Sequence, residues 1–414
     1  MPVNLNLPQG APVAGIELVS LAAGIKRDRT PDMVVARIAE GSSCAAVFTQ
    51  SAFCAAPVTI CKQQLLDSHG AIRALLINSG NANAGTGEPG IVMARGHCDA
   101  VATALSIPSS SVLPFSTGVI GQLLPDSIMR EGIATAGELL AAGGTTDLSA
   151  WQSAARGIMT TDTVPKLTSQ LIDVDGQSVT VCGMAKGSGM IQPDMATMLS
   201  YIFTDASIAK KHLESALREA VELSFNAITV DSDTSTNDAC VLVATGASQP
   251  TAAELGPEHA DWPLFMQALV RVFTDLAQSI VRDGEGATKF ISVHVDGGAD
   301  RAECKQVAYA IANSPLVKTA MFASDANVGR LLMAIGKAGV AGLDASRVRV
   351  SLGDVLAFES GGIAPEYTEE RGSAVMAGEE IDVFVDLGRG TATATVYTSD
   401  LSHDYVSINA DYRS

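Results

Sequence analysis

Charged residues are scarce in this 414-residue chain, and bases are scarcer than acids. Only 17% of the residues are Asp, Glu, Lys or Arg, and 27 bases stand against 45 acids, which gives a formal net charge of −18. A protein that binds a nucleic-acid backbone or an anionic membrane surface needs a basic footprint, so we expect neither as a partner. An anionic substrate would have to be held locally by one or two placed cations.

The sequence also lacks the segments of a secreted or membrane-spanning protein. Its first residues show no basic stretch followed by an apolar run, as a signal peptide would. No apolar run approaches the roughly 20 residues that cross a bilayer. The seven cysteines (positions 44, 54, 61, 98, 182, 240 and 304) are odd in number and stand among apolar neighbours, which favours reduced thiols. We therefore expect a cytoplasmic protein.

Several common catalytic signatures are missing as well. The six histidines never fall at metal-ligand spacing, and the chain has no Cys-x-x-Cys pair. Residues 183–190 place a lysine among glycines, but not in the order of a phosphate-binding loop. Residues 231–238 begin like a calcium loop but lack its glycine and its bidentate glutamate. No Gly-x-Ser-x-Gly elbow occurs, and we expect no metal and no cofactor.

Apolar periodicity predicts a mixed α/β protein. Hydrophobic residues make up 47% of the chain, so a large core is expected. Residues 75–78 and 178–182 are typical of buried strands, and residues 382–386 alternate as a half-exposed strand does. Helical spacing is clear at 207–223 and at 269–280. Short Gly/Ser-rich stretches at 143–149 and 245–252 could separate lobes.

Residues 186–199 combine a glycine-rich loop, a proline and a threonine at the head of an apolar run. Thr197 follows Ala196 and precedes the strand-like residues 198–203. If the Thr197 hydroxyl attacked the Ala196 carbonyl, an N→O acyl shift and hydrolysis would free the Thr197 α-amine. A free α-amine has a reference pKa of about 7.7–8.0, so it could deprotonate its own hydroxyl near neutrality. On residue chemistry alone, an ordinary threonine at a strand start remains the alternative.

This segment is one of several that resemble, in the same order, the ornithine acetyltransferase family of arginine biosynthesis. Residues 183–199 resemble the family's self-cleavage signature. Further matching blocks span most of the chain, at residues 45–58, 78–87, 116–121, 159–163, 228–238, 282–289, 313–320 and 405–410. The resemblance implies an α+β fold with an αββα-type sandwich, like that of the related N-terminal-nucleophile aminopeptidases.

The resemblance also implies an activity and a processing step. Cleavage between Ala196 and Thr197 would give chains 1–196 and 197–414, which form one intertwined catalytic unit and assemble as an α₂β₂ heterotetramer. The reaction would be a ping-pong transfer of acetyl from N²-acetylornithine to glutamate through an acetyl-threonine. Some family members also take acetyl from acetyl-CoA, so it is a possible co-substrate here.

Catalytic roles follow by matching positions to the family's motifs. Thr197 matches the nucleophile. Thr117 and Gly118 match the oxyanion-hole pair, in which the threonine donates through its hydroxyl and the glycine through its backbone N–H. A tetrahedral oxyanion requires such fixed donors. Without the resemblance, a glycine turn capped by a threonine would be the simpler interpretation of these two residues.

The remaining matched positions are those that contact substrate: Thr160, Lys186, Thr197, Glu285, Asn409 and Ser414. Lys186 is the expected cation for a substrate carboxylate, although a solvated surface lysine is the alternative. Glu285 would pair with the side-chain ammonium of ornithine. Asn409 and Ser414 would offer hydrogen bonds.

Two departures from the family's pattern bear on the range of acyl donors. Val328 stands where the family has tryptophan, and Ala227 stands where it has arginine. An aminopeptidase or amidase on the same scaffold is the alternative enzyme. A non-catalytic amino-acid-binding protein that kept the scaffold is the alternative outside enzymes.

Overall fold

Two β-sheets packed face to face form the larger lobe of the molecule. The computed structural model describes residues 2–5, 10–192, 198–248 and 254–410. The first sheet has the order β1 (Ile16–Leu21), β2 (Met33–Ile38), β4 (Ala74–Asn81), β5 (Val112–Val119). The second has the order β3 (Ser43–Phe48), β10 (Ala239–Ala244), β8 (Leu199–Thr204), β7 (Gln177–Lys186), β6 (Lys166–Val174). The pairs β4–β5 and β8–β10 are parallel and the others in these two sheets are antiparallel.

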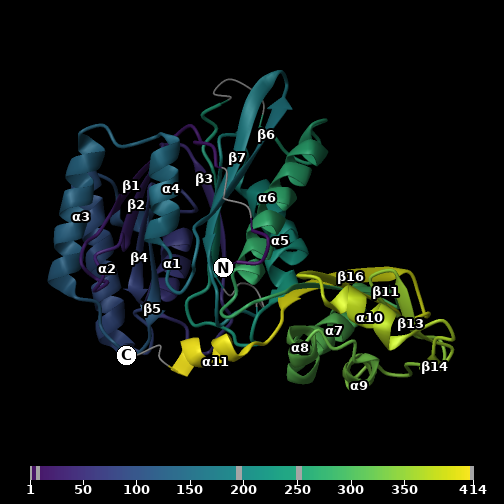
Figure 1. Ribbon diagram of the computed structural model, residues 1–414. Helices are drawn as coiled ribbons and strands as arrows, with labels where there is room; N and C mark the ends of the chain where they lie inside the picture. The colour runs from purple at the N-terminus through teal and green to yellow at the C-terminus, as the bar shows by residue number, and fades with distance from the viewer. Residues whose placement is uncertain (1, 6–9, 193–197, 249–253, 411–414) are drawn as a thin grey trace.

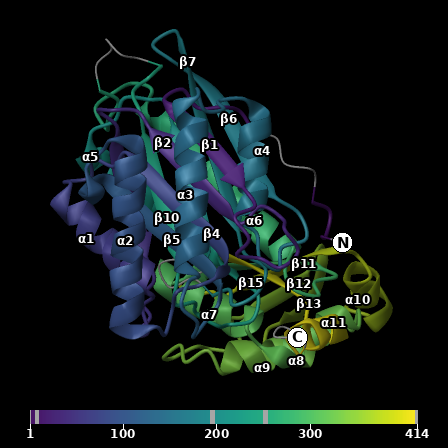
Figure 2. The same ribbon diagram turned by 90° about the vertical axis from the view of Figure 1, so that its left-hand side faces the viewer.

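Helices cover the outer face of each sheet, so the lobe has four layers (Figure 1). α2 (Gly87–Leu105) and α3 (Asp126–Ala141) pack on the first sheet. α5 (Lys210–Leu223) and α6 (Trp262–Arg282) pack on the second. α1 (Ala56–Asp67) and α4 (Leu148–Gly157) lie at the margins, and Figure 2 shows α2 and α3 side by side in front of the first sheet. The predicted αββα sandwich is confirmed.

Side chains alternate along the strands of the first sheet, and both faces of that sheet are buried. Leu18, Ile77 and Phe115 point from the first sheet into the shared core, whereas Val19 and Leu76 point outward under α2 and α3. From the second sheet, Tyr201 meets Phe115 edge-on, with ring centroids 5.1 Å apart. A strand that is buried on both faces has an almost continuous apolar sequence. The apolar run predicted at 198–203 is of this kind, and it forms β8.

α6 is the described helix that bears on the expectation that no segment crosses a membrane. By length and composition alone, its 21 residues could cross a membrane. In the fold, however, its apolar face carries ten buried residues, including Leu269, Phe273 and Ile280, and these pack in the same cluster as the outer face of the second sheet. Its length and hydropathy are therefore those of a core helix.

A smaller second lobe was not foreseen from the sequence. Its seven-stranded sheet has the order β14 (Gly362–Ile363), β13 (Val355–Glu359), β12 (Arg349–Leu352), β15 (Glu380–Asp386), β11 (Phe290–Gly298), β16 (Ala392–Ser399), β9 (Ile228–Thr229). Four helices pack on one of its faces: α7 (Arg301–Ala312), α8 (Pro315–Phe322), α9 (Val328–Gly336) and α10 (Glu369–Met376). β15 alternates strictly between exposed and buried residues, as predicted for 382–386.

The last helix returns to the sandwich. α11 (His403–Ala410) follows β16 and lies across the end of the four-layered lobe (Figure 1). β9 comes from the sandwich part of the chain yet pairs with β16, so the lobes share backbone hydrogen bonds. This return places residues near 405–409 beside residues near 285.

Other expectations have mixed outcomes. All seven cysteines are unbonded, and six of them are buried. The expected lobe boundary at 143–149 is wrong, because these residues join α3 to α4 and Thr145 bridges to Leu18. Residues 245–248 follow β10 within the sandwich, and 249–252 lie outside the described residues. The division at residue 196 stays a prediction, but the second sheet draws strands from both sides of it.

Candidate active site

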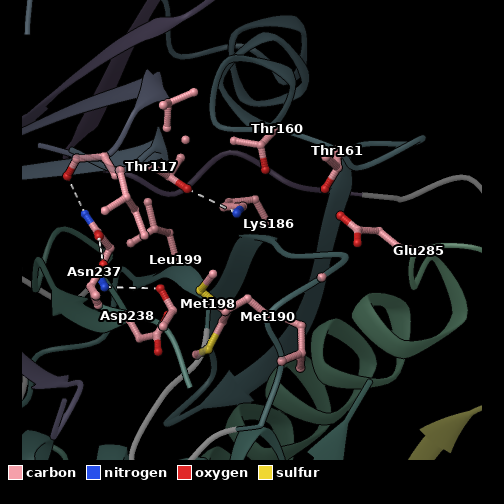
Figure 3. A pocket seen from close by; sticks show the side chains of 18 of the residues that line it. Thr117, Thr160, Thr161, Lys186, Met190, Met198, Leu199, Asn237, Asp238 and Glu285 are labelled. Carbon is pink, nitrogen blue, oxygen red and sulfur yellow. Dashed lines mark hydrogen bonds between the residues drawn. The ribbon is translucent and has the colours of Figure 1, made fainter. Parts of the chain in front are cut away.

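A cavity of about 270 Å³ opens where the strands of the two sheets end against α11. Its walls come from the ends of β5 and β7, the starts of β8 and β10, the loop after α4 and the turn after α6. Figure 3 shows the residues that the argument below uses: Thr117, Thr160, Lys186, Asp238 and Glu285. A concave site lined by a few convergent polar groups is the usual form of a small-molecule site.

Backbone at the end of β5 admits only glycine at position 118. Gly118 has φ of +129°, and a Cβ there would lie 2.3 Å from the backbone carbonyl carbon of Gly80. Two asparagines fix this turn: Asn78 accepts from the Ser116 hydroxyl at 2.6 Å, and Asn237 donates to the Ser116 carbonyl at 2.9 Å. The Asn-rich block around residue 78 thus serves to hold the Thr117 and Gly118 backbone against the cavity.

Lys186 is the cation beside this turn. Its Nζ donates to Thr117 Oγ1 at 3.2 Å, which is the dashed contact in Figure 3. Burial lowers the pKa of Lys186, and the carboxylates of Asp162, Asp238 and Glu285 counteract part of that shift. Lys186 therefore lies near three acidic side chains, and their electrostatic effect favours its charged form in the cavity.

A buried ion-pair triad ties together the loops that carry the cavity's polar groups. Lys166 Nζ lies 2.7 Å from carboxylate oxygens of both Asp162 and Asp283, and these side chains are 0–1% exposed. Asp162 also accepts from the backbone N–H groups of Thr160 at 3.0 Å and Gly187 at 2.8 Å. One triad thus fixes the loop after α4, the end of β7 and the turn after α6.

Glu285 is held at the far side of the cavity. Its backbone N–H donates to the Ser188 carbonyl at 2.9 Å, and Asn409 Nδ2 donates to its Oε2 at 2.8 Å. Gly189 leaves room for this carboxylate, because a Cβ there would lie 2.4 Å from Glu285 Oε2 and would push the side chain aside. α11 therefore contributes to the site through Asn409, as the resemblance implies.

β8 and β10 bring Asp238 to the cavity. The two strands run parallel with Leu199 opposite Ala239, and the Ala239 N–H donates to the Met198 carbonyl at 2.9 Å. Asp238, one residue earlier, lines the cavity and is 3% exposed. Among the described residues its Oδ2 has no hydrogen-bond partner, and burial raises the pKa of its carboxyl well above the usual range.

Six of the predicted site residues meet in this one cavity although they are far apart in sequence: Thr117, Gly118, Thr160, Lys186, Glu285 and Asn409. Thr161 lines it too. Ala196, Thr197 and Ser414 lie outside the described residues. Their roles, and those of the six, stay predictions.

Sequence reasoning assigned no role to Asp238, which lines the cavity, or to the ion-pair triad that supports that cavity. Asp238 lies at the end of the quoted block 228–238 but received no role. Asp162 lies in block 159–163 and Asp283 in block 282–289, yet Lys166 belongs to no block, so nothing signalled the triad.

The two departures from the family's pattern lie away from this site. Val328 is 5% exposed in the core of the second lobe, and Ala227 is 3% exposed beside β9; neither belongs to the described lining of the cavity. Elsewhere, Asp175, His259 and Asp261 bring ligand atoms within 4.8 Å of one another at the surface. Sequence spacing did not reveal that cluster, because Asp175 lies 84 positions before His259 and only the fold brings it beside His259 and Asp261.

The αββα sandwich and its polar cavity define a class of protein, an enzyme with a site for a small charged substrate. The comparisons give the family. The chain belongs to the ArgJ family, whose model matches residues 17–414. The arginine biosynthesis bifunctional protein ArgJ of Pseudomonas syringae pv. tomato is 51% identical over 416 residues, and the alignment covers 100% of both chains.

Two solved structures are similar to this chain. The crystal structure of arginine biosynthesis bifunctional protein ArgJ from Bacillus halodurans is 41% identical, with a TM-score of 0.50, and covers 52% of this chain and 100% of its own. Ornithine acetyltransferase from Mycobacterium tuberculosis, complexed with ornithine, is 35% identical, with a TM-score of 0.40, and covers 46% of this chain and 99% of its own.

Proposed function

We propose that this protein is a glutamate N-acetyltransferase of arginine biosynthesis that moves acetyl from N²-acetylornithine to glutamate through an acetyl ester on Thr197. Membership of the ArgJ family over residues 17–414 supports the reaction. The observation that carries the site is the convergence of six residues, predicted from separate motifs, in one cavity.

Self-cleavage between Ala196 and Thr197 is the first step of the proposal, because it creates the free α-amine. Residues 197–414 are 218 of the 414 residues, about 53%, and the Bacillus halodurans chain aligns over its full length with 52% of this chain. That is the size expected of one product. The two products would stay together, since β8 and β10 are hydrogen-bonded between β7 and β3.

In the first half-reaction, Thr197 Oγ attacks the acetyl carbonyl. The α-amine takes the hydroxyl proton and returns it to the departing ornithine nitrogen. The Thr117 hydroxyl and the Gly118 N–H stabilise the oxyanion. Because Lys186 Nζ already donates to Thr117 Oγ1, the hydrogen of that hydroxyl is free for the oxyanion. Each donor of this kind lowers the barrier by about 2.7–4 kcal/mol.

Substrate recognition uses the charges around the cavity. Glu285 pairs with the side-chain ammonium of ornithine, and Lys186 with a substrate carboxylate. Thr160, Asn409 and Ser414 add hydrogen bonds. No cofactor or metal is required, and acetyl-CoA is a possible second acetyl donor. Enclosure of the site slows hydrolysis of the ester, which would waste the acetyl group.

The proposal extends to assembly and location. We propose an α₂β₂ heterotetramer of the two cleaved chains, working in the cytoplasm and independent of nucleic acid and membranes. The net charge of −18 supports the last part, because both of those partners favour basic surfaces.

The test is a product assay with N²-acetylornithine in the presence and absence of glutamate. We expect N-acetylglutamate and ornithine in equal amounts when glutamate is present, and little free acetate without it. The Thr197→Ala protein should stay full-length and inactive. Rapid acetate release that glutamate does not affect would instead identify an amidase, the alternative on this scaffold.

A further inference from the structure

The proposed function leaves one proton without an acceptor. Glutamate reaches the acetyl-enzyme largely as an ammonium, which has no lone pair and cannot attack until it loses a proton. The attack then releases a second proton. The Thr197 amine can accept that second proton and pass it to Oγ as the ester bond breaks, so the first proton needs another base inside the cavity.

Asp238 has the properties that such a base requires. It is 3% exposed, lines the cavity, and stands at the start of β10 beside Met198, the residue that follows the proposed nucleophile. Its Oδ2 lacks a hydrogen-bond partner among the described residues. Burying a polar atom without a hydrogen-bond partner is costly, so an unpartnered carboxyl oxygen on the wall of a cavity points to a group of the ligand as its partner.

Glu285, the other carboxylate in the described lining of the cavity, already has a hydrogen-bond partner. Glu285 accepts from Asn409 at 2.8 Å, and Figure 3 shows it across the cavity from Asp238, with Lys186 between them. A substrate ammonium bound by Glu285 is therefore not the one that reaches Asp238. Asp238 lies on the side of Met198 and Leu199, where β8 begins.

We propose that Asp238 binds the α-ammonium of the incoming amino acid and accepts one of its protons, which makes that amine the nucleophile for the acetyl-enzyme. This inference rests on the proposed function. It adds to that function a second base, distinct from the Thr197 amine and specific to the second half-reaction.

The step balances over one turnover. The Asp238 carboxylate takes H⁺ from –NH₃⁺, and the resulting –NH₂ forms the new C–N bond to the acetyl carbon. The C–Oγ bond breaks, and the second nitrogen proton goes to Oγ. Ornithine released in the first half-reaction as –NH₂ becomes –NH₃⁺, so the proton held by Asp238 has an acceptor in the next cycle.

The groups facing Asp238 suit this task. Ser235 hydrogen-bonds to its carboxyl, and Lys186 approaches from β7 and lowers its pKa, whereas burial raises it more strongly. Glu285 is the further acid across the cavity. An arriving ammonium favours the charged form of Asp238, so the carboxylate left after ornithine has taken its proton stays available as the acceptor. A base with a pKa near the working pH is the most effective.

The experiment separates the half-reactions in the cleaved enzyme. Acetyl-enzyme is formed with N²-acetylornithine, freed of ornithine by rapid gel filtration, and then mixed with glutamate or with hydroxylamine. Hydroxylamine is largely uncharged at neutral pH and needs no base before it attacks. We expect Asp238→Asn to lower the rate at which glutamate removes the acetyl group from the enzyme by about 10²–10⁴-fold. The rate at which hydroxylamine removes it should change by less than about threefold, because hydroxylamine needs no base.

Two variants and the pH profile complete the test. Asp233→Asn removes the same charge from the exposed part of the same loop and should leave both rates unchanged. Asp238→Glu keeps a carboxylate and should recover part of the glutamate rate. In Asp238→Asn, the glutamate rate should climb as pH rises, because free amine becomes available.

The possible results distinguish failure of this inference from failure of the proposed function. Equal rates with glutamate in wild type and Asp238→Asn would overturn the inference, and so would equal losses with both nucleophiles or a variant that forms no acetyl-enzyme. Failure of the wild type to form acetyl-enzyme would instead overturn the proposed function.

Discussion

Lys166→Met is the substitution that most directly tests how the cavity is held together. Lys166 Nζ lies 2.7 Å from Asp162 and 2.7 Å from Asp283, and all three side chains are 0–1% exposed. Removing the cation leaves two buried carboxylates that keep their hydrogen bonds but lose their nearest counter-charge, although Lys186 still acts on Asp162. Breaking a buried ion pair in this way costs about 3–5 kcal/mol, so we expect a loss of that size in the free energy of unfolding.

The loss should depend on pH in a definite direction. In the wild type the pKa of Asp162 is lowered, so its contribution is present above the carboxyl's unfolded value and is lost as pH falls through the folded value. The pKa of Lys166 is raised, so its contribution is lost only as pH rises through that raised value. The wild type therefore keeps the triad between about pH 5 and 9. In the variant, Lys166 no longer offsets the burial of Asp162, so that carboxyl should take up a proton at a higher pH than in the wild type. The difference in unfolding free energy between the two proteins should therefore shrink as pH falls from 8 to 5.

Urea unfolding of Lys166→Met and wild type, followed at several pH values, measures this gap. Lys210→Met is the matched control: Lys210 Nζ is 3.7 Å from Glu214 on an exposed helix face, and such pairs contribute about 0–1 kcal/mol. A loss below about 1 kcal/mol for Lys166→Met, or a gap that does not change with pH, would refute the reasoning.

Three further predictions concern the cavity itself. Thr117→Ala should lower kcat by about 10²–10³-fold with little change in KM, and Thr117→Ser should restore most of it, as steady-state kinetics with N²-acetylornithine will report. Gly118→Ala should be more damaging than Thr117→Ala, because its Cβ would lie 2.3 Å from the Gly80 carbonyl carbon at a φ of +129°; turnover equal to wild type would show that this turn is not needed. Glu285→Gln should raise KM for N²-acetylornithine at least about tenfold, the value of one charge-assisted hydrogen bond, with a smaller effect on kcat, and an unchanged KM would remove Glu285 from substrate binding.

The sandwich could be predicted because local pattern and resemblance agree there. The spacing of Leu269, Phe273 and Ile280 identifies α6, and the apolar run at 198–203 identifies β8. The second lobe escaped prediction as a unit, although its strand at 382–386 was predicted, because its sheet joins β9 to segments more than 60 residues later. No local pattern encodes such a pairing.

The same distinction applies to the site. Six residues that line the cavity could be matched one by one, because each lies in a short block that resembles a motif of the family. Lys166 lies in none of the matched blocks, and only the fold brings it within 2.7 Å of Asp283, 117 positions away. Asp238 stands in the matched block 228–238, but the sequence could not show that its Oδ2 is buried without a hydrogen-bond partner among the described residues, because that depends on the fold.

A mass spectrum of the purified protein, taken before and after addition of N²-acetylornithine, tests the central claim most directly. The account predicts two polypeptides, 1–196 and 197–414, of which only the second gains the mass of one acetyl group, and it loses that mass when glutamate is added. A single full-length chain, or cleaved chains that never become acetylated, would contradict it.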